Sequence, residues 1–150
     1  MITFKDDNKL IELSINDYQY PEITEGYYDC DWLSVHLYAK DGKQEWEKND
    51  SAFLTFELTE MADWFETLAK GKNPEHKDLR FYEPCVAFKY KRYNDFYKIT
   101  VVLEAEFLPP GMAFEDSYKI EFKCTKAELA TIALNVKSAI NKYAVRGDYS

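Results

Sequence analysis

Glycine and histidine are scarce in this chain, and their scarcity excludes several kinds of active site. With 5 glycines in total, the sequence contains neither a phosphate-binding loop nor a dinucleotide-binding fingerprint. It also has no Gly-x-Ser-x-Gly nucleophile elbow. The 2 histidines, His36 and His76, lack a second histidine or a cysteine at metal-ligand spacing, whereas zinc needs about three or four converging ligands. We therefore expect no catalytic nucleophile, no metal and no cofactor, and we interpret both histidines as structural or solvated.

Cysteines and long hydrophobic runs are also few. Cys30, Cys85 and Cys124 are odd in number and widely separated, which favours reduced thiols over a disulfide framework. The segment Met1–Leu10 has no apolar core of signal-peptide length, and no stretch approaches the roughly 20 apolar residues that cross a bilayer. These absences predict a cytoplasmic protein without a membrane-spanning helix.

Basic residues are outnumbered by acidic ones. The chain has 19 Lys and Arg against 27 Asp and Glu, a net charge of −8. Such a charge disfavours binding to nucleic acid or to an anionic membrane, and it attracts basic partners. The same charge is explained equally well by solubility alone.

One segment reverses this balance. Lys70–Arg92 carries seven Lys or Arg and three Asp or Glu, with aromatic residues between them. A sheet that binds single-stranded nucleic acid combines such features. We favour this interpretation less, because several of these aromatics alternate inward as core and the whole chain repels phosphate.

Aromatic residues are abundant, at 17% of the 150 residues, and they favour a strand-rich fold. Hydrophobic and polar residues alternate in many short runs, which is the two-residue period of half-buried strands. Turn signals separate these runs, including Asp41-Gly42 for a hairpin and Asn49–Ser51. The predicted strands cover residues 2–4, 11–15, 32–39, 44–48, 52–58, 79–81, 86–91, 99–107 and 118–124.

Two segments have helical periodicity instead. The first is predicted to begin at the cap Thr59 and to stop at Gly71. The second begins with the capping box Thr125-x-x-Glu128 and runs to about Tyr143, and the tail Arg146–Ser150 is expected to be loose. Each helix has one apolar stripe that needs a sheet to cover. We therefore predict one α+β domain over residues 1–150: a curved, mainly antiparallel β-sheet with two amphipathic helices packed on it.

The loop Asp17–Asp31 is the most suggestive candidate for a binding surface. It contains five acidic residues, four tyrosines and no Lys or Arg. Tyrosines supply rigid contact area, and carboxylates steer a basic partner. The alternative is a loop whose tyrosines pack back on the sheet edge. The candidate partner-binding residues are Tyr18, Tyr20, Glu22, Glu25, Tyr27, Tyr28 and Asp29.

Paired carboxylates offer a second interpretation. Glu104 and Glu106 are two residues apart on a predicted strand, so both would project from one face, as acid and base chemistry requires. With His36 they would form an enzyme or small-ligand site. We favour the simpler interpretation, in which the pair lies on a solvated sheet face beside Lys89 and Lys91 of a neighbouring strand.

The order of segments resembles that of the WapI-type immunity proteins, small bacterial cytosolic proteins encoded beside toxins. The resemblance rests on an Asp-rich approach to Trp32-Leu33, a strand with Trp46, a closing helix, and the segments LTFELTEMADWFETLAKG, FYEPCVAF and VVLEAEFLPPG. It implies a non-enzymatic protein that binds and blocks the carboxy-terminal domain of a cognate toxin, often a nuclease directed at RNA. It implies no catalytic residues. A ligand-binding protein or enzyme, and a self-associating structural protein, remain the alternatives.

Overall fold

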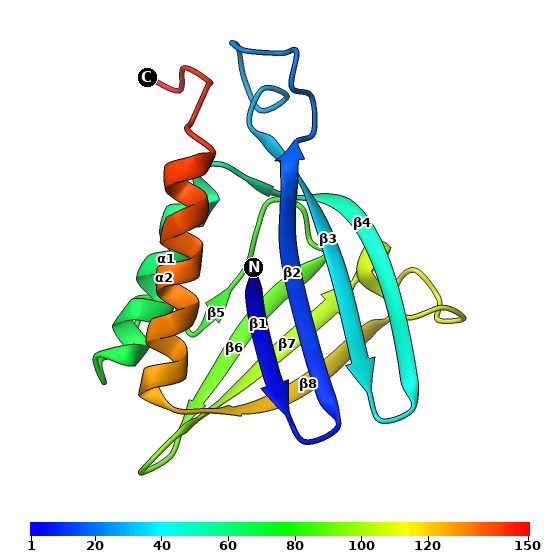
Figure 1. Ribbon diagram of the computed structural model, residues 1–150, viewed down its shortest axis with the longest axis vertical. Helices are drawn as coiled ribbons and strands as arrows, with labels where there is room; N and C mark the ends of the chain where they lie inside the picture. Colours follow the sequence, from blue (N-terminus) through cyan, green and yellow to red (C-terminus); the bar gives the residue numbers. More distant parts are fainter.

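Alternating hydrophobic and polar residues build eight antiparallel strands, which form two sheets in the computed structural model of residues 1–150 (Figure 1). The α+β class and the mainly antiparallel pairing are confirmed, although the strands divide between two sheets where one was expected. The first sheet has the order β1 (Ile2–Asp6), β2 (Lys9–Tyr18), β3 (Trp32–Asp41), β4 (Gln44–Leu54). The second has the order β5 (Asp78–Leu79), β6 (Val86–Arg92), β7 (Tyr97–Glu104), β8 (Ser117–Cys124).

The core lies where the two sheets and the helices meet. Phe4 on β1 is at its centre, with its ring centroid 5.6 Å from that of Phe88 on β6 and 5.6 Å from that of Phe122 on β8. The ring of Phe65, on helix α1 (Glu57–Ala69), lies 5.9 Å from Phe4. Burial of each such ring contributes about 1.5–3 kcal/mol to stability. Aromatic packing therefore joins the first sheet to the second.

Strand β4 passes through the segment that was predicted to be a turn. Asn49–Ser51 pairs with β3 as part of one strand, so the predicted turn is wrong. The register shifts where Leu33 pairs with Phe53 and Ser34 pairs with Ser51, leaving Ala52 as an extra residue on β4. Such a bulge bends a strand and changes which of the following side chains point toward the core. The ladder therefore accommodates a polar run without a reversal of the chain.

Helix α1 begins two residues before the predicted cap. Strand β4 ends at Leu54, and the helix starts at Glu57, so the predicted strand over 52–58 is too long and Thr59 is not the cap. The buried Glu57 carboxylate accepts the amide of Leu54 through Oε1 at 2.9 Å, which turns the chain out of the sheet. The predicted stop is confirmed, because Gly71 follows the helix with a φ of 76°.

Helix α2 (Lys126–Lys142) begins as the sequence predicts. The Thr125 hydroxyl accepts the amide of Glu128 at 3.1 Å, and the Glu128 carboxylate accepts the amide of Thr125 at 2.9 Å. The two helices lie side by side along one flank of the sheets (Figure 1). Neither helix is long and apolar enough to cross a membrane.

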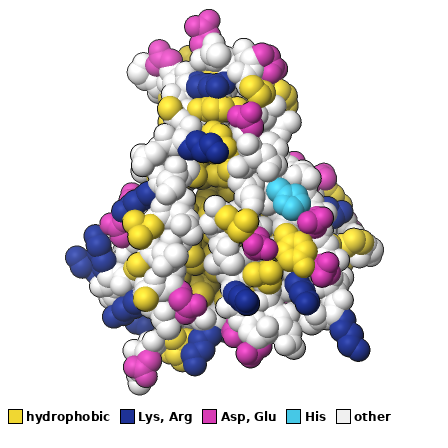
Figure 2. Space-filling model, viewed as in Figure 1, with side chains coloured by type: hydrophobic (Ala, Val, Ile, Leu, Met, Phe, Trp, Pro, Cys, Tyr) yellow, Lys and Arg dark blue, Asp and Glu magenta, His cyan; other side chains and the backbone are white.

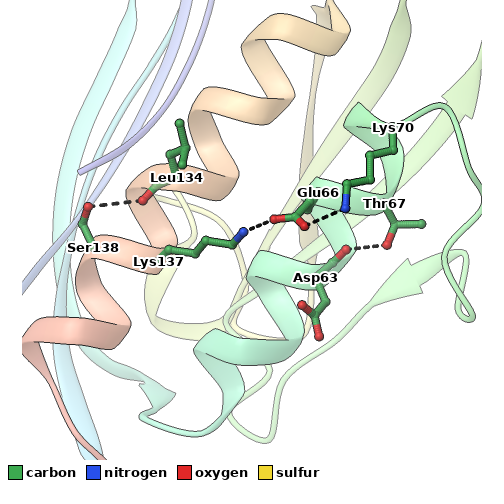
Figure 3. A network of polar contacts seen from close by, with 7 residues as sticks. All are labelled: Asp63, Glu66, Thr67, Lys70, Leu134, Lys137 and Ser138. Atoms are coloured by element: carbon green, nitrogen blue, oxygen red, sulfur yellow. Dashed lines mark hydrogen bonds and ion pairs between the residues drawn. The ribbon is translucent and has the colours of Figure 1, made fainter.

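Glu66 links the two helices on their outer side (Figure 3). Its Oε1 pairs with Lys70 on the same helix at 3.0 Å, and its Oε2 pairs with Lys137 of α2. Hydrogen bonds from Lys137 and then Lys70 lower the pKa of Glu66. Exposed ion pairs of this kind add little to stability because solvent screens them, so the buried faces of the helices contribute most of the energy that holds them together.

Candidate protein-binding surface

The loop Asp17–Asp31 and the C-terminal tail lie together at one end of the molecule, beyond the end of β2 (Figure 1). Backbone and side-chain hydrogen bonds join the two segments, although more than a hundred residues separate them. Figure 2 shows acidic and hydrophobic side chains at this end, with basic side chains among them. The loop is therefore part of a surface made by several segments.

A buried carboxylate holds this end together. Asp31 is 0% exposed, and its Oδ1 accepts the Thr55 hydroxyl at 2.8 Å and the Arg146 amide at 2.7 Å. Its Oδ2 accepts the Gly147 amide at 2.9 Å and the Tyr149 hydroxyl at 2.5 Å. A buried charge is tolerated only when it is fully hydrogen-bonded. The prediction of a loose tail over Arg146–Ser150 is therefore wrong, because the tail supplies three of these donors.

The ionisation of Asp31 reflects this environment. Burial opposes the charged form, but the hydrogen bonds from Arg146, Tyr149, Thr55 and Gly147 favour it and lower the pKa of Asp31 below its ordinary value. Burial and the bond to Asp31 raise the pKa of the Tyr149 phenol. The carboxylate is therefore charged, and the phenol donates to it, at neutral pH.

Arg146 fastens the tail to the loop from the other side. Its guanidinium lies 3.4 Å from the centroid of the Tyr18 ring, and its Nη1 donates to the carbonyls of Pro21 at 2.9 Å and Ile23 at 3.2 Å. The Tyr18 hydroxyl donates to the carbonyl of Ala144 at 2.6 Å. Tyr18 is thus packed within the molecule, in the way that the alternative interpretation of the loop expected.

Other candidate residues of the loop are open to solvent. Tyr27 is 72% exposed, Tyr28 is 42% exposed and Tyr20 is 40% exposed. The carboxylates of Glu22, Glu25 and Asp29 are exposed around them. The structure therefore divides the predicted residues into an inner anchor, Tyr18, and an outer set of tyrosines and acids.

Aromatic residues from other segments enlarge this surface. The Tyr28 ring lies 5.4 Å from Tyr82, 5.8 Å from Tyr149 and 6.3 Å from Phe56. Tyr82 is 67% exposed, in the loop before β6. Sequence reasoning did not assign these three residues to this surface, because Phe56 lies in a predicted strand, Tyr82 in the basic segment Lys70–Arg92 and Tyr149 in the tail that was expected to be loose. We define the tyrosine surface as Tyr27, Tyr28, Phe56, Tyr82 and Tyr149.

A second buried carboxylate positions Tyr82. Glu57 accepts the amide of Tyr82 through Oε2 at 2.8 Å while its Oε1 holds Leu54. Burial raises the pKa of Glu57 in spite of these two amide bonds. The backbone at Tyr82 is therefore held in place by Glu57 at the start of α1, while the Tyr82 ring stays exposed.

The alternative catalytic residues are not brought together. Strand β7 ends at Glu104, and Ala105 adopts a φ of 52° at the start of the short 3-10 helix η1 (Ala105–Phe107). Glu106 thus leaves the strand, and the expectation that both carboxylates share a strand face is wrong. His36 lies on the other sheet, where its Nε2 is 3.7 Å from Glu47. No group of three or more His, Cys, Asp or Glu side chains is arranged to hold a metal ion.

The largest groove lies beside α1, between the helix and the segment Pro74–Arg80. It has a volume of about 580 Å³, and the Trp64 indole on its wall donates to the His76 carbonyl at 2.9 Å. Asp78 in this groove is already near Arg80, at 3.7 Å. The remaining acidic side chains that line it are Glu60, Asp63 and Glu75.

We expect Asp31→Asn to release the C-terminal tail while the sheets stay folded. An amide presents one acceptor oxygen and an NH₂ group, so it cannot accept all four donors, and each charged hydrogen bond lost costs about 1.5–3 kcal/mol. Hydrogen exchange at the amides of Arg146 and Gly147 should accelerate by about tenfold or more. Asp41→Asn is the matched control, because Asp41 accepts the Tyr118 hydroxyl at 2.7 Å. Unchanged protection of the tail in Asp31→Asn would contradict the assignment.

The same contact predicts an acid-dependent release. A carboxylate whose folded-state pKa is lowered stabilises the docked tail above its ordinary value of about 4, and that contribution is lost as the pH falls through the folded-state pKa. The amide resonances of Arg146 and Gly147 should therefore stay constant from neutral pH to about pH 4 and move only below it. A midpoint clearly above the ordinary Asp value would exclude Asp31 as the group responsible.

Comparison with known proteins identifies the family. The model of the immunity protein WapI-like family matches residues 1–144. No curated protein and no solved structure gives a match. The matched range includes both sheets and both helices, and it ends just before the tail residues that bind Asp31. The resemblance drawn from the order of segments is confirmed, and the chain belongs to the immunity protein WapI-like family.

Proposed function

We propose that this protein is an immunity protein that binds a cognate bacterial toxin domain in the cytoplasm and neutralises it without catalysing a reaction. The family match over residues 1–144 carries this proposal. The toxin domain is a basic protein, most simply a nuclease, whose substrate path is covered when the complex forms. The tyrosine surface and the acids of the neighbouring loop are the proposed contact region.

Two physical features support this contact region. The exposed tyrosines supply large, rigid contact area, of the kind enriched among residues that dominate binding energy. The exposed carboxylates of Glu22, Glu25 and Asp29 lie in the same loop, which contains no Lys or Arg. The nearby cation of the tail, Arg146, is bound to backbone carbonyls and to the Tyr18 ring. Carboxylates steer a basic protein toward the surface, and aromatic contacts then slow its release.

The test of the proposed function is coexpression with the toxin domain encoded in the adjacent gene. We expect this protein to restore growth of cells that produce the toxin domain, and the two proteins to elute together from a sizing column. A catalytically inactive toxin variant should bind equally well, because the immunity protein acts by occlusion. Continued killing together with separate elution would reject the proposal.

Charge reversal should slow association with the toxin domain. Replacement of Glu22, Glu25 and Asp29 by lysine removes the steering field of the loop, so the association rate at low salt should fall by about tenfold or more. The dissociation rate should change less, and the effect should shrink as salt is added. Stopped-flow or surface-based kinetics at two ionic strengths measure this.

A matched triple variant separates local steering from net charge. It reverses three exposed acids that lie on other segments, so the net charge changes by the same amount. Its association rate should stay close to that of the natural protein. Equal slowing in both triple variants would remove the loop from the contact region. The control positions are Glu45, Asp95 and Glu115.

A further inference from the structure

Aromatic rings at the loop end of the molecule form a row that crosses several segments of the chain, which we call the ring row. The centroid of the Tyr27 ring lies 6.1 Å from that of Tyr149, which lies 5.8 Å from that of Tyr28. The Tyr28 ring is 5.4 Å from Tyr82, and the Tyr82 ring is 6.1 Å from Trp32, the first residue of β3. Aromatic rings in contact pack at such distances. The loop, the tail, the segment before β6 and the start of β3 thus share one aromatic platform.

Exposed hydrophobic side chains are concentrated on this platform and beside it. Ten large hydrophobic side chains are exposed in the whole chain, and five of them are tyrosines of the loop Asp17–Asp31, the segment before β6 and the tail. Single exposed apolar residues are ordinary, but a contiguous group of them marks a contact surface. Because these five are all tyrosines, ring faces and phenols rather than aliphatic groups decide what the surface can bind. The five are Tyr20, Tyr27, Tyr28, Tyr82 and Tyr149.

The electrostatics of the ring row favour a cation. The π face of an aromatic ring is negative, so a cation placed over it is attracted. Asp29 follows Tyr28 in the loop, and its side chain is exposed. Asp148 precedes Tyr149 in the tail and is exposed as well. The loop contains no Lys or Arg that would neutralise these acids. Ring faces and carboxylates therefore attract the same kind of group.

The protein already contains one contact of this kind beside the ring row. The Arg146 guanidinium lies 3.4 Å from the centroid of the Tyr18 ring. Its Nη1 donates to the carbonyls of Pro21 and Ile23, so one cation uses a ring face and loop oxygens together. A guanidinium is planar, weakly hydrated and rich in donors, whereas an ammonium is compact and strongly hydrated. The chemistry of this end is therefore better matched to arginine than to lysine.

The centre of the ring row is fixed in place. Tyr28 has a φ of 40°, in the left-handed region that bulky side chains rarely adopt. Its amide donates to the Tyr149 hydroxyl at 3.0 Å. Its carbonyl accepts the amides of Asp31 at 2.8 Å and Trp32 at 3.0 Å. A strained backbone persists only where its surroundings hold it, and such residues cluster at ligand contacts. The Tyr28 ring is thus positioned before a partner arrives.

We propose that the ring row binds arginine side chains of an extended segment of the partner protein. This inference rests on the proposed function, and it names the chemistry that the toxin domain presents to this surface. Each guanidinium lies flat on an exposed ring, such as that of Tyr82, and its N–H groups donate to carboxylates of the loop. The carboxylates speed the encounter, while the ring faces decide which cation is held.

The experiment uses the full chain alone, titrated with short peptides at constant ionic strength and followed by NMR. One peptide carries arginines in a Gly-Ser background, and two others carry lysine or citrulline at the same positions. Citrulline has the planar shape of arginine without its charge. We expect the arginine peptide to produce saturable shifts at the amides of Tyr28 and Tyr82. It should bind about tenfold more tightly than the citrulline peptide and about threefold more tightly than the lysine peptide.

Three results of this titration would overturn the inference. The first is the absence of saturable binding by the arginine peptide, and the second is equal binding of the citrulline or lysine peptide. A proline-rich peptide forms the last arm, because such segments also dock on aromatic surfaces. Tighter binding of that peptide than of the arginine peptide is the third.

Variants assign the ring. Tyr82→Leu should weaken binding of the arginine peptide by about fivefold, with an unchanged thermal midpoint because the Tyr82 side chain is 67% exposed. Tyr93→Leu is the matched control, since Tyr93 is 39% exposed in the β6–β7 hairpin at the other end of the molecule (Figure 1). It should bind the peptide as the natural protein does. Equal weakening in the two variants would contradict the assignment.

Fluorinated phenylalanines at position 82 separate the charge of the ring from its shape. Tyr82→Phe keeps the ring face, and added fluorine atoms withdraw its electron density while its shape changes little. Affinity for the arginine peptide should fall step by step as fluorine atoms are added. An affinity that stays constant along the series would reveal a contact of shape alone and would overturn the inference.

The peptide titration and the coexpression test fail independently. If the protein neutralises the toxin domain but no arginine peptide binds, this inference is wrong and the proposed function stands. If the arginine peptide binds but the protein forms no complex with the toxin domain, the proposed function is wrong and the arginine-binding surface stands.

Discussion

The buried carboxylate of Asp31 is the contact on which the loop Asp17–Asp31 and the C-terminal tail depend for their arrangement. A charge with no exposed surface must find donors within the protein, because its desolvation is otherwise too costly. The donors come from the junction between β4 and α1, through Thr55, and from the tail, through Arg146, Gly147 and Tyr149. One side chain thus connects the start of β3 to two segments that are distant in sequence.

This connection explains how a loop and a tail can form a defined surface. The rings of the tyrosine surface come from separate segments, and buried carboxylates accept hydrogen bonds from these segments. Asp31 holds the tail that carries Tyr149, and Glu57 holds the backbone of Tyr82. Contact groups that are already ordered lose little conformational entropy when a partner binds. The same hydrogen bonds that satisfy two buried carboxylates therefore order the tyrosine surface.

Charge is distributed unevenly over the molecule. The loop Asp17–Asp31 has acids and no Lys or Arg, whereas the segment Lys70–Arg92 carries seven Lys or Arg against three Asp or Glu. The net charge of −8 conceals this difference. Because screening limits the reach of a charge to about 10 Å at 0.1 M salt, each segment sets the field in its own neighbourhood.

Much of the fold could be predicted because its signals are local. The alternation in Trp32–Ala39, the Asp41-Gly42 hairpin and the capping box at Thr125 each involve residues a few positions apart, and all three are present in the structure. The early start of α1 could not be predicted. It depends on Glu57, whose carboxylate binds the amides of Leu54 and the distant Tyr82.

The sequence by itself determined the kinds of element, their order and the family, because periodicity, caps and turns are encoded within short windows. Tertiary structure alone decided that the strands form two sheets, that the tail is anchored, and that Tyr28, Tyr82 and Tyr149 form one surface. These features arise when buried polar groups find partners far along the chain. No local pattern marks which distant donor a carboxylate such as Asp31 will meet.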